Sequence, residues 1–162
     1  MFEFTPPAGD QPDIVYAELT QAAQALVAGE ADAVANMANV AALIWQYLPD
    51  LNWAGFYRLV GGELVLGPFI GKPACIRIPL GRGVCGTAAA TQTTQLVADV
   101  HAFPGHIACD AASASELVVP VLHAGRLLGV IDLDSPLPGR FTPADAAGIE
   151  TLARAIAPAI AA

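Results

Sequence analysis

The spacing of apolar residues predicts two helices in the first third of the chain. Over 13–27 the apolar side chains recur on one stripe, and Gly29 follows as a residue that ends the helix. Over 32–48 they are separated by steps of three and four residues, the spacing of one helix face. These positions are Val34, Met37, Ala41, Ile44 and Leu48. Such a stripe is typical of a buried core face, and it also suits a homodimer contact.

The middle of the chain shows patterns typical of β-strands. Gly61-Gly62 separates two strand-like runs, which favours a tight hairpin. A second hairpin is predicted over 116–135, with its turn near 123–125. The connection over 99–116 has no periodicity, and a connection that long is often functional. The other predicted strands lie at 53–60, 63–69, 74–78 and 94–100, and a short alanine-rich helix lies at 83–92.

A last helix is predicted after Thr142, whose hydroxyl is a suitable N-cap before Pro143 and Asp145. Its apolar stripe consists of Ile149, Leu152, Ile156 and Ile160. Two helices, several antiparallel strands and a final helix predict an α+β fold with the helices packed on the sheet. Residues 1–12 hold three prolines and are predicted to form a flexible arm, and 13–162 form one domain.

Composition narrows the classes of function. Of the 162 residues, 55% are hydrophobic and 14% are charged, which favours a packed core over disorder. The net charge of −8 disfavours nucleic-acid partners and anionic membranes. Three cysteines, an odd number, argue against a secreted disulfide framework and for a reducing compartment. With no signal peptide or membrane span in the sequence, we expect a cytoplasmic protein.

Two acids interrupt an otherwise good strand. Asp132 and Asp134 are two residues apart, so their side chains share one face, ~7 Å apart along the strand. If Ile131 and Leu133 point into the core, both carboxylates point away from it, and mutual repulsion should raise one pKa. The alternative is a solvated sheet face that leads into a turn.

Trp53 and Tyr57 are four residues apart on the first hairpin strand and also share a face. At the backbone they would be roughly 13 Å apart, enough to wall a small pocket. The alternative is that they are ordinary core or surface aromatics.

His101, His106, Cys109 and Asp110 lie in the long connection, but their spacing does not match that of structural zinc sites, so no metal is expected. The alternative for Cys109 is that it is not functional and serves as a small buried hydrophobic residue.

Four segments together resemble the free methionine-(R)-sulfoxide reductases, which have the GAF fold. They are LNWAGFY (51–57), ELVLGPFIGKPACIRIPLGRGVCGTAAAT (63–91), DVHAFPGHIACDAASASELVVPV (99–121) and GVIDLDSP (129–136). The resemblance covers roughly residues 31–155. It implies a GAF-like α+β domain with a central antiparallel sheet of about six strands, and a thiol enzyme that returns free methionine from its R-sulfoxide.

The resemblance implies a role for each cysteine. Cys109 is expected to attack the sulfoxide sulfur and become a sulfenic acid, and Cys75 to resolve it as a disulfide. Cys85 is expected to be an auxiliary thiol that can take over either role. An external dithiol, thioredoxin, would then reduce the disulfide, and no bound cofactor is needed.

The same resemblance implies a substrate site. Glu116, Asp132 and Asp134 are expected to form an acidic cluster, one member of which stays protonated and donates to the sulfoxide oxygen. The remaining charge would hold the substrate's ammonium group, with Trp53 and Tyr57 at its methyl–sulfur end. Backbone amides of the 108–116 segment are candidates for binding its carboxylate. A homodimer is expected. The alternative functions are a non-catalytic GAF module that binds a small ligand or senses redox state, and a zinc-binding interaction module.

Overall fold

The computed structural model describes residues 3–7, 11–106 and 111–161. Its helices are α1 (Pro12–Val27), α2 (Ala33–Tyr47), α3 (Gly83–Thr91) and α4 (Pro143–Ile160), with a 3-10 turn, η1, at Val100–Ala102. Its strands are β1 (Trp53–Val60), β2 (Glu63–Gly71), β3 (Arg77–Pro79), β4 (Gln95–Val97), β5 (Ser115–His123) and β6 (Arg126–Ser135). The predicted α+β architecture is confirmed.

The strands form a six-stranded antiparallel sheet in the order β3-β2-β1-β6-β5-β4. Both predicted hairpins are present, and they lie side by side because β1 pairs with β6. Gly61 and Gly62 have φ values of 61° and 87°, which is the backbone that a two-residue hairpin turn requires. The β1–β2 register shifts between Gly55 and Tyr57. This irregularity lies under the candidate site.

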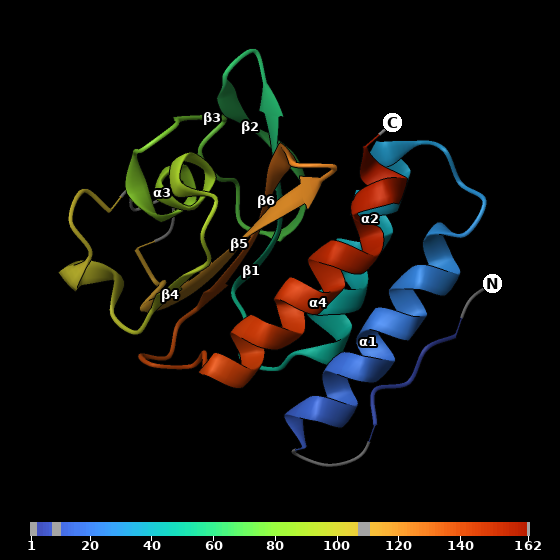
Figure 1. Cartoon of the computed structure of the whole chain (residues 1–162). Helices are drawn as coiled ribbons and strands as arrows, with labels where there is room; N and C mark the ends of the chain where they lie inside the picture. Colours follow the sequence, from blue (N-terminus) through green and yellow to red (C-terminus); the bar gives the residue numbers. More distant parts are fainter. Residues whose placement is uncertain (1–2, 8–10, 107–110, 162) are drawn as a thin grey trace.

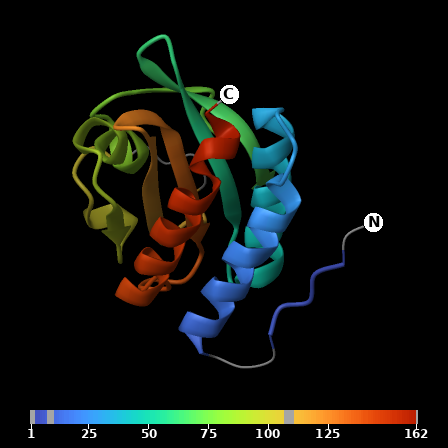
Figure 2. The same ribbon diagram turned by 45° about the vertical axis from the view of Figure 1, so that its right-hand side comes forward.

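The helices divide the sheet into two different faces. In Figure 1, α1, α2 and α4 cover one face, and α3 lies on the opposite face beside β3 and β4. Figure 2 shows α1 and α4 running side by side over the same face. Each face has its own cluster of buried side chains. The face under the three helices holds the larger core, and the α3 face holds the candidate site.

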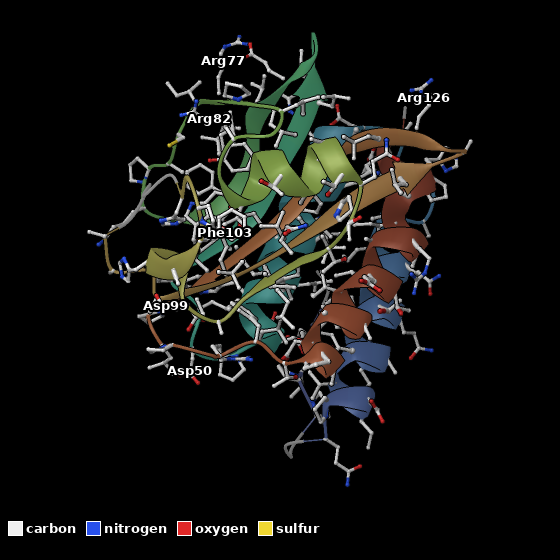
Figure 3. The ribbon with its side chains drawn as sticks, turned by 60° about the vertical axis from the view of Figure 1, so that its left-hand side comes forward. Asp50, Arg77, Arg82, Asp99, Phe103 and Arg126 are labelled. Carbon is white, nitrogen blue, oxygen red and sulfur yellow. The ribbon has the colours of Figure 1, made fainter. Side chains whose placement is uncertain are left out.

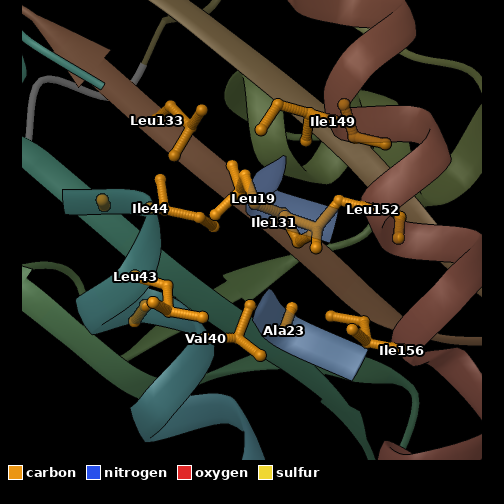
Figure 4. Close-up of a cluster of buried hydrophobic side chains, with 14 of the residues drawn as sticks. Leu19, Ala23, Val40, Leu43, Ile44, Ile131, Leu133, Ile149, Leu152 and Ile156 are labelled. Carbon is orange, nitrogen blue, oxygen red and sulfur yellow. The ribbon is translucent and has the colours of Figure 1, made fainter. Parts of the chain in front are cut away.

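The predicted helix stripes are core faces. Figure 4 shows Leu19 of α1, Ile44 of α2, Leu152 of α4 and Ile131 of β6 meeting in one cluster. From the stripe over 32–48, Met37, Ala41, Ile44 and Leu48 are buried there, whereas Val34 is 50% exposed. The core interpretation of this stripe is therefore confirmed for those four residues, which leaves them no surface for a homodimer contact.

A network of polar groups fixes the start of α4 against α1. The predicted N-cap Thr142 is confirmed, and its side chain forms a capping box with the Asp145 carboxylate. The Tyr16 hydroxyl donates a hydrogen bond of 2.6 Å to Asp145 Oδ1. Arg140 adds an ion pair to the same carboxylate. This buried acid therefore has donors from α1, from the N-cap residue Thr142 and from the preceding loop.

Some predicted elements are shorter in the structure. The strand expected over 74–78 is limited to Arg77–Pro79, and the strand expected over 94–100 is limited to Gln95–Val97. The described part of the arm, 3–7 and 11, contains no helix or strand, and Phe4 packs against the core. Among the described residues, no helix combines the length and apolarity needed to cross a bilayer.

Candidate active site

Three acids from two neighbouring strands meet on the α3 face of the sheet. Glu116 of β5 lies directly opposite Asp134 of β6, and Asp132 precedes Asp134 on the same face. Ile131 and Leu133 are fully buried on the other face, so the predicted alternation of β6 is confirmed. Glu116 and Asp132 are each only 6% exposed. The solvated-face alternative is therefore wrong for Asp132.

Burial controls the protonation of this cluster. Desolvation, with the nearby charge of Asp134, raises the pKa of Glu116 well above its ordinary value. Desolvation, with the nearby charge of Glu116, does the same to the pKa of Asp132. The predicted rise of a carboxyl pKa is confirmed, but its main cause is burial and not repulsion. A carboxyl group of this kind stays protonated where an exposed one ionises, so it can act as an acid.

Cys85 completes the buried cluster from α3. Its side chain is 4% exposed, and its Sγ lies 3.9 Å from Glu116 Oε1. Burial and the charges of Asp132 and Glu116 raise the pKa of the thiol well above its ordinary value. A neutral thiol is a weak nucleophile, so this position does not favour Cys85 as the first attacking group. Cys85 is a free thiol.

Two aromatic rings form one wall of the site and lie closer together than expected. The ring centroids of Trp53 and Tyr57 are 5.8 Å apart, and Phe69 of β2 stacks on Trp53 with centroids 5.1 Å apart. Gly55 lies between them on β1 and pairs with Phe69, and its lack of a side chain makes room for Phe69. A Cβ atom at Gly55 would lie 2.4 Å from the Cβ of Phe69. Phe69 was not among the predicted site residues, because the sequence pattern does not show that it pairs with Gly55.

The same two aromatics hold the segment that contains Cys75. The Trp53 indole N–H donates to the Lys72 carbonyl oxygen at 3.2 Å, and the Tyr57 hydroxyl donates to the Cys75 carbonyl oxygen at 2.9 Å. Cys75 is half-buried and disulfide-bonded. Cys109, the predicted nucleophile, and Asp110 lie outside the described residues.

These side chains line a small cavity of about 40 Å³. Six of the predicted site residues contribute to its wall: Trp53, Tyr57, Cys85, Glu116, Asp132 and Asp134. Several further residues line the cavity. Lys72, Arg82 and His106 were not among the predicted site residues, and Ser113 belongs to the 108–116 segment expected to bind the substrate's carboxylate. Ser113 lies in the long connection that was expected to be functional. The cavity therefore joins acidic, basic, thiol and aromatic groups.

His106 lies beside the acidic cluster. Its Nε2 lies 3.6 Å from Glu116 Oε2, and burial lowers the pKa of the imidazole. His101 is exposed at η1. A different set, Cys85, Glu116 and Asp132, offers ligand atoms within 4.8 Å of one another, close enough to hold an ion. The expectation that no metal binds stays a prediction.

The sequence and this fold match known proteins along most of the chain. The GAF domain family matches residues 18–160. A protein of Escherichia coli named free methionine-R-sulfoxide reductase is 54% identical over 137 residues, which are 85% of this chain and 83% of the relative. The chain belongs to the free methionine-R-sulfoxide reductase family. The predicted GAF fold and the predicted class of enzyme, an oxidoreductase, are confirmed.

Two further members of the family support this membership. A free methionine-R-sulfoxide reductase of Saccharomyces cerevisiae is 47% identical over 79% of this chain and 76% of its own length. The free methionine-R-sulfoxide reductase of Neisseria meningitidis, solved in complex with its substrate, is 42% identical. It superposes with a TM-score of 0.94 over 99% of this chain and 96% of its own. The shared fold therefore extends over the sheet and the helices that position the site.

Proposed function

We propose that this protein reduces free L-methionine-(R)-sulfoxide to L-methionine. The observation that carries the proposal is the buried cluster of Glu116 and Asp132, whose raised pKa values keep a proton available beside an aromatic wall. A sulfoxide sulfur becomes electrophilic when its oxygen accepts a proton or a strong hydrogen bond. The family relatives from Escherichia coli and Saccharomyces cerevisiae carry the name of this activity, and the Neisseria meningitidis structure holds its substrate.

The acids divide two tasks between them. Glu116 or Asp132, in its protonated form, donates to the sulfoxide oxygen as the thiolate attacks. Ionised members of the cluster, with Asp134, bind the substrate's ammonium group. Asp132 Oδ1 is buried without a hydrogen-bond partner among the described residues. Because an unsatisfied buried acceptor is costly, a cationic N–H donor from the substrate would stabilise this position.

The thiols act in sequence. The Cys109 thiolate attacks the sulfur, methionine leaves, and the oxygen remains on Cys109 as a sulfenic acid. The Cys75 thiol then attacks the sulfenic acid, forming a disulfide and releasing water. The disulfide-bonded state of Cys75 and the hydrogen bond that holds its carbonyl oxygen to Tyr57 support this resolving role. Cys85 is the auxiliary thiol, and its raised pKa favours that role over first attack.

Selectivity for the free amino acid follows if both charged ends of the substrate are bound. Trp53 and Tyr57 would contact the methyl–sulfur end, the acids the ammonium group, and backbone amides within 108–116 the carboxylate. A peptide-bound methionine sulfoxide lacks both charges, so the acids would be buried without their partner.

Turnover needs an external reductant, and we propose thioredoxin, with no bound cofactor. A reducing compartment suits a chain with an odd number of cysteines, so the cytoplasm is the proposed location. A homodimer is also proposed. The exposed apolar side chains Val34 and Trp45 on α2 make that helix the candidate dimer contact. Analytical ultracentrifugation would measure the oligomeric state.

The deciding experiment follows NADPH consumption in an assay coupled to thioredoxin and its reductase. We expect turnover with free methionine-(R)-sulfoxide and none with the S epimer or a peptide. Tight binding without turnover would instead support the non-catalytic GAF sensor. Cys109→Ser should abolish single-turnover methionine release, and survival of that release would remove Cys109 as the nucleophile.

A second variant shows which of the two remaining thiols, Cys75 or Cys85, resolves the sulfenic acid. Cys75→Ser should release roughly one methionine per enzyme and then cycle slowly with thioredoxin. Normal cycling of this variant would make Cys85 the resolving thiol.

A further inference from the structure

The residues around Cys75 have an unusual charge for this chain. Between Glu63 and Asp99 the sequence contains no acid, although the whole chain has 15 acids and a net charge of −8. The same stretch holds three of the chain's seven cations, Lys72, Arg77 and Arg82. All three are exposed and lie within seven residues of Cys75, and Arg77 forms an ion pair with Glu63. In Figure 3, Arg77 and Arg82 lie together along the upper left edge, away from Asp50 and Asp99 near the lower end.

The same segment exposes apolar side chains. Ile76, next to Cys75, is 70% exposed, the largest exposed fraction of any large hydrophobic side chain among the described residues. Leu80 is 40% exposed, and Pro73 and Pro79 are also on the surface. We call the exposed residues of 71–82 the Cys75 rim. An exposed apolar centre with polar and charged residues around it is typical of a protein–protein contact.

The backbone of the Cys75 rim is held in place from below. Trp53 and Tyr57 bind the carbonyl oxygens of Lys72 and Cys75, and the Ile76 carbonyl oxygen accepts from the Leu66 amide at 2.9 Å. With its carbonyl groups directed toward the sheet, the segment presents Ile76 outward. A fixed surface of this kind loses little conformational freedom when it binds a partner.

We propose that the Cys75 rim is the docking surface for the protein dithiol that reduces the Cys75 disulfide. The partner's contact face is apolar at its centre and acidic around it, because the rim offers Ile76 and Leu80 among three cations. Opposite charges across a contact raise the rate of association. The inference rests on the proposed function, since it names where the reductant of that same reaction binds.

The chemistry at this surface is thiol–disulfide exchange. A thiolate of the partner attacks the Cys75 sulfur, which forms a mixed disulfide and breaks the disulfide of this protein. The released thiolate takes up a proton from solvent. The partner's second thiol then loses its proton and attacks the mixed disulfide, and the Cys75 thiolate that leaves is protonated. Two electrons and two protons pass to this protein, and the partner becomes the oxidised disulfide.

The test compares a protein reductant with a small one. Turnover of free methionine-(R)-sulfoxide is measured in Ile76→Glu with thioredoxin and, separately, with dithiothreitol. The new charge opposes an acidic partner, and the apolar contact is lost. We expect the KM for thioredoxin to rise about tenfold, an effect of ordinary size for one contact residue. Turnover with dithiothreitol should stay within about twofold of the unchanged protein, because a small dithiol needs no docking surface.

Two further variants sharpen this test. Ile76→Lys keeps the sign of the Cys75 rim while removing the apolar group, so its KM should lie between those of Ile76→Glu and the unchanged protein. Leu96→Glu is the control, since Leu96 is an exposed apolar residue (40% exposed) on β4, at the opposite edge of the sheet. It should leave both reductants unaffected. Raised ionic strength should increase the KM for thioredoxin, because screening weakens attraction between opposite charges.

The outcomes are distinguishable. If Ile76→Glu lowers turnover equally with both reductants, or leaves the thioredoxin KM unchanged, the docking proposal is wrong. An equal loss in Leu96→Glu would likewise contradict it. If the unchanged protein turns over with neither reductant, it is the proposed function that fails. Thermal unfolding of each variant shows whether a loss of activity reflects loss of the fold.

Discussion

The Tyr57 hydroxyl donates a hydrogen bond of 2.9 Å to the carbonyl oxygen of Cys75. Tyr57, on the central strand β1, therefore holds the segment that contains the disulfide-bonded Cys75, while its ring stacks on Trp53. The substrate wall and the thiol segment are thus positioned by the same side chain. Changes at this residue should affect the redox step before they affect the fold.

Tyr57→Phe keeps the ring and removes the hydroxyl. Loss of one hydrogen bond costs about 0.5–1.5 kcal/mol, so we expect thioredoxin-dependent cycling to slow by roughly two- to tenfold. Methionine release in a single turnover should change less, because stacking against Trp53 remains. Rapid-quench measurement of both steps checks this. Tyr47→Phe, in a tyrosine buried in the core under the helices, is the control, and an equal effect there would contradict the prediction.

Glu116→Gln keeps the shape of the side chain but removes its acidic proton. Loss of a group that stabilises the transition state lowers kcat by about 10²- to 10³-fold, and we expect a loss of this size. Steady-state kinetics with the free R-sulfoxide measure it. Glu18→Gln, at an exposed position on α1, makes the same chemical change without effect. A near-normal rate for Glu116→Gln would remove the acidic cluster from the mechanism.

The buried acids make stability depend on pH in an unusual direction. Because the folded-state pKa values of Glu116 and Asp132 are raised, the folded protein keeps protons that the unfolded chain releases above about pH 4. The free energy of unfolding should therefore fall as pH rises from about 5 toward 8. In urea unfolding, the double variant Glu116→Gln, Asp132→Asn should show a weaker dependence of the free energy of unfolding on pH.

The control for that experiment is the exposed pair Asp13→Asn, Glu18→Gln, which removes the same number of carboxyl groups. It should keep the pH dependence of the unchanged protein. If the two double variants behave alike, desolvation of the cluster does not influence stability in this range.

Gly55→Ala tests the contact that brings the aromatic rings together. The new Cβ would lie 2.4 Å from the Cβ of Phe69 and 2.7 Å from the Pro68 carbonyl oxygen, so Phe69, which stacks on Trp53, must shift. Overpacking of this kind costs about 1–3 kcal/mol of stability. We expect the KM for substrate to rise as well, because the wall of the cavity shifts.

Gly67→Ala is the matched comparison for Gly55→Ala. Gly67 lies in the same strand pair, and its new Cβ would lie 2.9 Å from the Phe56 carbonyl oxygen and 3.4 Å from the Phe56 Cβ. Since Phe56 packs in the core under the helices, this variant should lose stability without changing the KM. Equal changes in KM would show that general loosening of the strands is responsible.

Periodicity was sufficient to predict the helices, both hairpins and the side of β6 that bears acids. Periodicity failed where backbone groups form hydrogen bonds with side chains instead of with a neighbouring strand. The strand expected over 74–78 begins only at Arg77, where pairing with β2 starts, and the Cys75 carbonyl oxygen before it accepts from the Tyr57 hydroxyl. No local pattern encodes such long-range contacts.

The site was predicted in part for the same reason. Glu116, Asp132 and Asp134 could be assigned from strand spacing and family resemblance, and the cavity contains them. His106 had been noticed, but its partner Glu116 is brought to it only by the fold. The approach of Phe69 to Trp53 depends on Gly55 and a register shift between two strands, which sequence spacing alone does not reveal.

The alternation along β6 has a consequence for how this protein can change. Ile131 and Leu133 build the core under the helices, and Asp132 and Asp134 build the cavity on the other face. A slip of one residue in strand pairing, or the insertion of one residue, would exchange the two sets. Carboxylates would then enter the core, and the apolar residues would fill the cavity. Any chain that pairs this strand wrongly therefore loses the fold and the chemistry together, so a stable but inactive form with a shifted register is excluded.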